Sequence, residues 1–230
     1  APRGRRAQAK ARTKPFPLEQ VLDTLLAQAP TWNAPVVTFM AQSGDDPWMV
    51  LTSCLLSLRT RDETTGPASA RLFARARTPR ELLALSEGEV AKLIYPVGFY
   101  RTKARTLRTI AKTLLEQHGG AVPSDEAALL ALPGVGRKTA NLVLSQAFAT
   151  PAICVDTHVH RIPNRWGLVK TKTPEQSEQA LRAVVPERWW IDLNPVLVAF
   201  GQTICQPVSP LCTECPVATA CARVGVTKSR

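Results

Sequence analysis

Apolar residues recur at helical spacing along nearly the whole chain. The first such stripe consists of Val21, Leu22, Leu25 and Leu26. Residues three and four apart lie on the same side of a helix, so this stripe predicts an amphipathic helix. Asp46 followed by Pro47 is typical of a helix start, because aspartate caps free backbone N–H groups and proline fits the first turn. We therefore expect an apolar helix from residue 48 to about residue 58.

The same pattern predicts helices over most of the remaining chain. They are expected at about residues 64–76, 78–85, 86–94, 102–117, 124–130, 137–149, 174–185 and 188–203. One more should open at Asp156 and run toward Trp166, with a break near Pro163. Strand signals are weak, and the best candidate, residues 36–39, is better explained as a loop or a helix start. The sequence therefore predicts an all-α protein.

Positive charge is concentrated at the amino end but is not confined to it. The chain has a net charge of +11 and a sequence pI of about 9.9. Six cations precede the first acidic residue, Glu19, and they are Arg3, Arg5, Arg6, Lys10, Arg12 and Lys14. They predict a flexible arm over residues 1–16 that makes at most non-specific contact with DNA. The rest of the chain still carries +5, which favours a polyanionic partner, although a merely soluble basic protein has a similar balance.

Composition restricts the class of protein further. The 230 residues, 45% of them hydrophobic, suffice for one large domain or two small ones. No apolar run is long enough to cross a bilayer, and the amino end lacks the apolar core of a signal peptide, so we expect an intracellular protein. Four of the six cysteines are crowded near the carboxyl end. In a reducing compartment such a group is better explained as metal ligands than as disulfides.

The most informative segment is residues 129–140. Two predicted helices flank a tight turn that contains Gly134 and Gly136, and glycine suits a turn that needs positive φ or presses against a ligand. The helix after the turn presents free N–H groups, which can hold a phosphate without reading a base. A P-loop is disfavoured, because it needs a preceding strand and no residue between the second glycine and the lysine, whereas Arg137 precedes Lys138 here. An ordinary helix–turn–helix connection is the alternative for the Gly-x-Gly alone.

The string Leu-Pro-Gly-Val-Gly-Arg-Lys-Thr-Ala-Asn at residues 132–141 resembles the helix-hairpin-helix signature of the endonuclease III family. The resemblance continues through residues 98–100, 114–118 and 155–158 and the terminal cysteines, and covers roughly residues 17–221. It implies a two-lobed, all-α DNA glycosylase fold with a C-terminal [4Fe–4S] cluster loop. It also implies that the hairpin contacts DNA through Gly134, Val135, Gly136, Arg137 and Thr139.

Lys138 lies in the first turn of the helix that follows the hairpin. From its position alone, phosphate binding is the more frequent role for such a lysine. The resemblance matches Lys138 to the family's catalytic lysine, which attacks C1′ of the damaged nucleotide, expels the base and forms a Schiff base that allows β-elimination. Related adenine glycosylases lack this lysine, so its presence favours a bifunctional enzyme.

Asp156 precedes a predicted helix and has the position of an N-cap. The resemblance matches it to the family's catalytic aspartate, whose carboxylate stabilises an oxocarbenium-like transition state near C1′. Both roles are compatible, because capping would fix the orientation of the carboxylate. On a strand, Asp156, His158 and His160 would share one face and could bind a metal, but the resemblance makes this segment helical. His158 is then better explained as packed or hydrogen-bonded.

The terminal cysteines have the spacing C-x6-C-x2-C-x5-C and are Cys205, Cys212, Cys215 and Cys221. Such a set suits a [4Fe–4S] cluster or a four-thiolate zinc site, although zinc sites usually have two C-x2-C pairs. The resemblance favours the [4Fe–4S] cluster. Residues 206–211 hold no Lys or Arg, where relatives are basic, which leaves phosphate contact by this loop open. Cys54 and Cys154 are predicted to be buried thiols.

A glycosylase must flip its target base out of the duplex, and another side chain must then fill the gap. The resemblance places Phe99 at the wedge position, although a core position is the commoner fate of a phenylalanine. It places Arg59, where relatives often have Gln, in the other inserting loop. Arg59 would fill the gap or pair with the orphan base, and Asp62 would cap the next helix.

These expectations combine into one architecture and one function. We expect a six-helix lobe over residues 40–150, with the hairpin at about 126–149. An iron–sulfur lobe would combine residues 17–39 with residues 151–230, including the cluster loop at 205–221. Lys138 and Asp156 would face each other across the cleft between the lobes.

The expected activity is removal of oxidised or damaged pyrimidines from duplex DNA, followed by nicking of the abasic site. The expected protein is a monomer with no membrane partner, which in a bacterium would be cytoplasmic and associated with the nucleoid. The alternatives are a monofunctional mismatch or adenine-type glycosylase, a non-catalytic DNA-binding module, and a metal hydrolase built on Asp156, His158 and His160.

Overall fold

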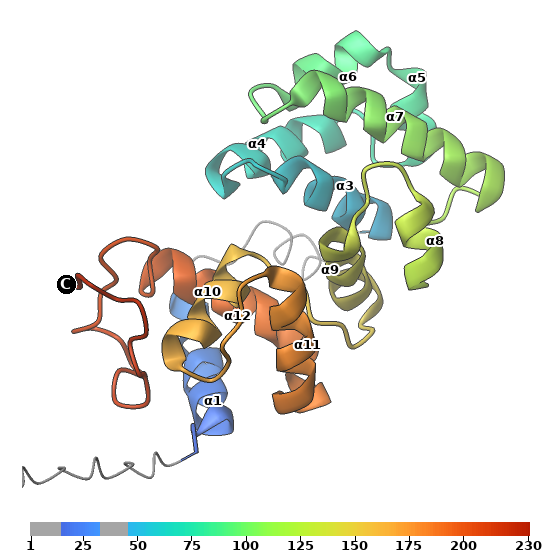
Figure 1. The fold of residues 1–230 in the computed structure, drawn as a ribbon. Helices are drawn as coiled ribbons and strands as arrows, with labels where there is room; N and C mark the ends of the chain where they lie inside the picture. The colour runs from blue at the N-terminus through green and yellow to red at the C-terminus, as the bar shows by residue number, and fades with distance from the viewer. Residues whose placement is uncertain (1–14, 33–45) are drawn as a thin grey trace, which may run out of the picture.

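The computed structural model describes residues 15–32 and 46–230, and every regular element in these ranges is a helix. The basic residues of the predicted arm up to residue 14, and the strand candidate at residues 36–39, lie outside the described residues. No helix in the described ranges is long and apolar enough to cross a membrane. The predicted all-α, two-lobed fold is confirmed (Figure 1).

The first group of helices occupies one half of the molecule (Figure 1). Its members are α3 (Pro47–Ser57), α4 (Asp62–Phe73), α5 (Pro79–Ala84), α6 (Glu87–Ile94), α7 (Tyr100–Gln117), α8 (Glu126–Ala131) and α9 (Arg137–Phe148). They enclose one continuous core, in which α7 packs against both α5 and α6 and α3 packs against α9. The described part of this stretch holds seven helices, one for each of the seven helical ranges expected between residues 48 and 149, so the expected total of six for this lobe was one too low. Helix α6 begins at the capping box of Ser86 and Glu89, directly after α5.

The second group of helices combines the amino end of the described chain with its carboxyl half. Its members are α1 (Leu18–Gln28), η1 (Ala29–Thr31), α10 (Thr157–Trp166), α11 (Pro174–Val184), η2 (Glu187–Trp189) and α12 (Trp190–Thr203). They enclose a second core, in which α12 packs against α1 and α10. Residues 204–230 follow α12 without a further helix and wrap the far end of this core (Figure 1).

Several details of the helices differ from the prediction. Helix α4 begins at Asp62, two residues early, and α8 is capped by Asp125, whose side chain accepts from the N–H of Ala128. Helix α10 continues through Pro163 without the expected break. The apolar face of α10, which includes Ile162 and Trp166, is buried in the second core, and this packing outweighs the lost N–H of the proline.

The two cores meet where the chain passes from α9 to α10. The amide of Asn141 on α9 donates to the carbonyl of Ile153 at 3.0 Å, and that of Asn194 on α12 donates to the carbonyl of Cys154 at 3.1 Å. Both asparagines are buried, so these hydrogen bonds satisfy backbone groups that water cannot reach. They fix the extended segment that leads directly into Asp156.

Candidate active site between the two cores

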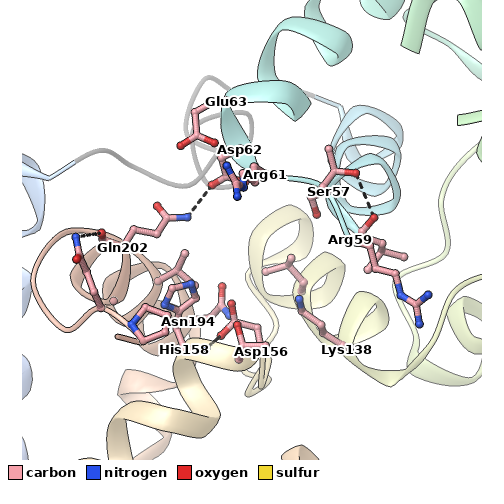
Figure 2. Close-up of a pocket in the computed structure, with 18 of the residues that line it drawn as sticks. Ser57, Arg59, Arg61, Asp62, Glu63, Lys138, Asp156, His158, Asn194 and Gln202 are labelled. Carbon is pink, nitrogen blue, oxygen red and sulfur yellow. Dashed lines mark hydrogen bonds between the residues drawn. The ribbon is translucent and has the colours of Figure 1, made fainter. Parts of the chain in front are cut away.

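A cleft of about 1530 Å³ opens between the two groups of helices (Figure 2). One wall comes from the end of α3, the start of α4 and the residues just before and within α7. The other wall comes from the start of α10, the end of α12 and residues 206–208. Lys138 and Asp156 both line this cleft, as do Arg59 and Phe99. The structure thus brings together predicted site residues that are as much as 97 positions apart in the sequence.

The hairpin has the geometry that its glycines suggest, but only one of them needs positive φ. Gly134 has φ of 76°, and a Cβ there would lie 3.0 Å from Cγ2 of Thr106. Gly136 has φ of −98° and open space where a Cβ would stand. It precedes α9, whose first turn receives no side-chain cap, so its N–H groups are available to a ligand. Gly136 therefore keeps the approach to these donors clear.

Two of the predicted hairpin contacts cannot use their side chains. Val135 is 6% exposed and Thr139 is 3% exposed, so both side chains are directed into the protein. Only their backbone groups remain for a phosphate. Arg137 is exposed but engaged: its Nε lies 2.9 Å from a carboxylate oxygen of Glu178 on α11, and this ion pair raises the pKa of Arg137. Glu178 is buried, and Arg182 contacts its other oxygen.

Lys138 is exposed on the first turn of α9. Its backbone carbonyl accepts a hydrogen bond of 3.5 Å from Sγ of Cys154. Cys54 and Cys154 are buried, as predicted. Burial raises the pKa of the Cys54 thiol to about 12 and shifts that of Cys154 in the same direction. The positive charge of Lys138 opposes both shifts in pKa. Because these thiols stay protonated, they do not compete with the amine as nucleophiles.

Asp156 caps α10, as the sequence predicts. Its Oδ1 accepts from the backbone N–H of His158 at 2.8 Å and from that of Val159 at 2.9 Å. No described residue donates to its other carboxylate oxygen. The cap therefore holds the carboxylate at the edge of the cleft while one oxygen remains free for chemistry.

The rival metal triad is not formed. Asp156, His158 and His160 lie at the start of a helix rather than on a strand. Nδ1 of His160 lies 2.6 Å from Oγ of Ser177, and Nδ1 of His158 lies 3.1 Å from a nitrogen of Arg161. Within residues 15–32 and 46–230, no three His, Cys, Asp or Glu side chains are grouped closely enough to enclose a metal ion.

Arg59 and Phe99 form a pair at the mouth of the cleft. The guanidinium carbon of Arg59 lies 5.6 Å from the centroid of the Phe99 ring, and Phe99 is 62% exposed rather than part of the core. Both residues have positive φ, 54° and 59°, which costs a non-glycine residue about 1–2 kcal/mol. The loops are fastened together, since the N–H of Gly98 donates to Oγ1 of Thr60 at 3.1 Å. A Cβ on Gly98 would lie 2.8 Å from the carbonyl oxygen of Arg59.

Lys103 supports this pair, a role that the sequence did not predict. Its Nζ donates to the carbonyls of Leu56 at 2.8 Å and Leu58 at 2.6 Å, and to Oγ1 of Thr60 at 3.3 Å. The lysine thereby caps the carboxyl end of α3 and fixes the loop that carries Arg59. Half-burial lowers the pKa of Lys103 to about 8. No local pattern signals this role, because the acceptors lie more than 40 residues earlier in the chain.

Asp62 also differs from its predicted role. It is the first residue of α4 rather than its cap. Its carboxylate accepts a hydrogen bond of 3.1 Å from the amide of Gln202, which reaches across from α12 (Figure 2). The two walls of the cleft therefore touch at this point.

The four terminal cysteines line a second, smaller pocket at the far end of the second core. Its other lining residues are apolar except for Arg165 and Arg223. Arg165 donates to the carbonyls of Gln206 and Pro207, both at 2.6 Å, and lies 3.5 Å from Sγ of Cys205. Burial is the largest cause of the raised pKa of Cys215, at about 11, and also raises that of Cys221.

The loop after Cys205 reaches back toward the cleft. Pro207 and Val208 line the cleft, and Val208 is 82% exposed. This part of the loop therefore presents an apolar, uncharged surface beside the site.

The chain matches the family model of the HhH-GPD superfamily of base excision DNA repair proteins over residues 52–187. That match includes the hairpin, Lys138 and Asp156. The fold and the site thus define a helix-hairpin-helix base excision DNA repair protein.

Comparison with individual relatives shows to which family within this superfamily the chain belongs. The chain is 51% identical over 176 residues to endonuclease III of Thermotoga maritima, with 76% of this chain and 83% of the relative covered. It is 41% identical over 175 residues to endonuclease III of Escherichia coli K12, with the same shares covered. A solved structure of a trapped covalent intermediate between endonuclease III and DNA superposes with a TM-score of 0.79 and 33% identity, covering 90% of this chain and 94% of the other. The chain belongs to the endonuclease III family, whose members are DNA N-glycosylases with abasic-site lyase activity.

Replacing Lys103 by Met should destabilise the protein, because it leaves the carbonyls of Leu56 and Leu58 without their donor. We expect a loss of about 1–3 kcal/mol in the free energy of unfolding, measured by chemical denaturation. Lys112→Met is the matched control, since Lys112 is exposed on the same helix and only pairs with Glu116. A Lys103 variant as stable as this control would contradict the assigned role.

The pH dependence supplies a second measurement on the same pair of variants. Because the pKa of Lys103 is about 8 in the folded protein against an ordinary value of 10.5, the unfolded chain binds one more proton between these pH values. The contribution of Lys103 to stability should therefore rise from pH 8 to 10.5. This rise should be absent from Lys103→Met and present in Lys112→Met.

Proposed function

We propose that this protein removes oxidised or otherwise damaged pyrimidines from duplex DNA and then nicks the abasic site by β-elimination. In this proposal Lys138 is the nucleophile and Asp156 is the assisting carboxylate. The observation that carries it is that an exposed lysine and a capped aspartate line one cleft large enough for an extruded nucleotide. A single copy of the chain supplies both groups, so a monomer suffices.

The hairpin would hold the DNA backbone. The uncapped first turn of α9 offers N–H groups and the positive end of the helix to a phosphate, and Gly136 leaves room for its approach. Contacts of this kind position the duplex but carry no base sequence. The basic balance of the chain supplies the long-range attraction.

Arg59 and Phe99 would occupy the space that the extruded nucleotide leaves. Phe99 offers an exposed ring at the mouth of the cleft, and Arg59 offers donors to the base that has lost its partner. Extrusion costs about a few kcal/mol of stacking and pairing, so a pre-formed wedge lowers the remaining cost. Lys103 would hold the wedge in shape through the end of α3.

The chemistry follows from the two side chains. The neutral amine of Lys138 attacks C1′, the bond from C1′ to the base breaks, and the base leaves with the bonding electrons and takes up a proton. The carboxylate of Asp156 stabilises positive charge on the sugar as this bond breaks. Opening of the sugar ring then gives an iminium between Nζ of Lys138 and C1′. Loss of a proton from C2′ expels the 3′ phosphate, and water finally releases the lysine.

The four terminal cysteines would hold a [4Fe–4S] cluster. The kind and number of donors suit this group, because Cys205, Cys212, Cys215 and Cys221 line one pocket that is otherwise apolar apart from two arginines. Within the described residues, no three of these thiols lie close enough together to enclose a metal ion, so binding the cluster would draw them closer. The cluster would serve as a structural centre that ties residues 205–221 together. Arg165 would balance negative charge near Cys205 and hold the following loop.

Lys138→Gln should abolish strand nicking and trapping by borohydride, because the amide cannot form the iminium. Binding to duplex DNA should largely survive, as measured by fluorescence anisotropy. Lys112→Gln, a remote exposed lysine on α7, serves as the control and should trap like the unchanged protein. Undiminished trapping by the Lys138 variant would refute the nucleophile. Base release by the unchanged protein without any trapping would instead favour a monofunctional glycosylase.

Asp156→Asn should slow base release about 10²-fold or more while DNA binding changes little. Asparagine is also a good N-cap, so helix α10 should keep its start and the loss can be attributed to the charge. Single-turnover release of the damaged base measures the effect. A near-normal rate would exclude a catalytic role for the carboxylate.

The purified protein should be brown and contain about four iron and four sulfide ions per chain. Cys215→Ser should lose most of the iron, whereas Cys54→Ser, a buried thiol in the other core, should keep it. Metal analysis and the visible absorption spectrum provide the readout. One zinc ion per chain, with no sulfide, would overturn the cluster assignment.

A further inference from the structure

His158 lies in the first turn of α10, two residues after Asp156, and lines the cleft. Its Nδ1 lies 3.1 Å from a terminal nitrogen of Arg161. A guanidinium group can only donate hydrogen bonds, so Nδ1 must accept this one and cannot carry a proton. The ring is then a neutral imidazole with its hydrogen on Nε2.

Arg161 is itself held in place by other acceptors. The same terminal nitrogen donates to the carbonyl of Cys205 at 2.8 Å, and its second terminal nitrogen lies 3.4 Å from the carbonyl of Thr157. The side chain is half-buried, and burial lowers its pKa without making it neutral. Arg161 therefore remains a fixed donor to His158.

Gly201 provides the space that the imidazole ring occupies. It is buried on α12, and a Cβ at this position would lie 2.2 Å from Nδ1 of His158 and 3.1 Å from the Arg161 nitrogen. Any larger residue would displace the ring from the cleft wall. The glycine is therefore required for space and not for backbone conformation.

Nε2 has no hydrogen-bond acceptor among the described residues. His158 is partly exposed, so this N–H is available to a ligand in the cleft. Burial is the largest cause of its lowered pKa, and the charges of Arg161 and Lys138 add to it, whereas those of Asp156 and Asp62 oppose it. A neutral ring with an outward N–H is thus the form present near pH 7.

We propose that His158 contributes to recognition of the extruded base by donating its Nε2–H to a carbonyl oxygen of the pyrimidine, with Arg161 and Gly201 fixing the tautomer and the position of the ring. This inference rests on the proposed function. Pyrimidines keep a ring carbonyl oxygen when oxidation or reduction destroys the double bond between C5 and C6. A donor aimed at that oxygen therefore accepts damaged and intact pyrimidines alike and disfavours adenine, which has no ring carbonyl.

The test compares two substrates that differ only in whether a base is present. Release of dihydrouracil from duplex DNA needs base contacts, whereas borohydride trapping on a preformed abasic site does not. His158→Leu should slow base release about tenfold or more, the size expected for one lost hydrogen bond, while trapping stays within about twofold. His158→Gln, which keeps a donor of similar reach, should recover part of the loss.

Each outcome of this comparison tests either the role of His158 or the proposed function. Unchanged base release in His158→Leu overturns the proposal, and an equal fall on both substrates also overturns it by indicating a structural role. Absence of trapping by the unchanged protein on either substrate would instead refute the proposed function. Gly201→Ala should reproduce the split seen for His158→Leu, since the added carbon takes the place of the ring.

Nuclear magnetic resonance tests the tautomer without any substrate. The chain has three histidines, so ¹⁵N-labelled imidazole signals can be assigned by comparison with His158→Gln. The signals of His158 should show a protonated Nε2 and an unprotonated Nδ1 at neutral pH. A ring protonated on Nδ1, or on both nitrogens, would overturn the proposed fixation by Arg161.

Discussion

The site depends on two buried amide hydrogen bonds that fix the chain between α9 and α10. Asn141 and Asn194 hold the carbonyls of Ile153 and Cys154, and the chain then enters the cap of α10 at Asp156. Lys138 lies in the first turn of α9, the helix that Asn141 ties to this connection, and Asp156 ends the connection. Because each asparagine satisfies an otherwise unpaired buried carbonyl, loss of either hydrogen bond would destabilise the folded protein. The separation between amine and carboxylate is therefore set by the protein before any DNA arrives.

Features of the site that depend on short stretches of sequence could be predicted. The hairpin, the helix starts at Pro47 and Arg137, and the cap formed by Asp156 all rest on residues within one turn of each other. The family resemblance supplied what residue spacing could not indicate. Above all, it supplied the prediction that Lys138, rather than another lysine, is the nucleophile. The lobe boundaries and the roles of the individual site residues stay predictions.

Features that depend on distant parts of the chain escaped prediction. Lys103, Glu178 and Gly201 have ordinary surroundings in the sequence, and apart from Arg182 their partners described above lie from 40 to 47 residues away. Arg137 has a partner of the same kind, since its place in the hairpin predicts a contact with DNA and a buried carboxylate on α11 also engages it. Contacts between distant parts of the chain determine the roles of these residues. The hydrophobic periodicity of a single helix carries no information about such contacts.

The strained loops at the mouth of the cleft illustrate how such packing is used. Arg59 and Phe99 both adopt left-handed backbone conformations that short peptides of these residues would rarely populate. Gly98, Thr60 and Lys103 hold them there through contacts that need the folded first core. Strain of this kind persists only where the surroundings over-determine it, and it concentrates at positions that meet ligands.

The uncharged loop after Cys205 has a consequence for the response of this protein to ionic strength. A duplex is surrounded by condensed counterions, and each phosphate neutralised by a lysine or arginine releases some of them. Pro207 and Val208 carry no charge. A duplex that lay against them would release hydration water from the apolar surface rather than counterions from its phosphates. If DNA contacts this loop, that contact would depend on burial of apolar surface, which added salt does not weaken.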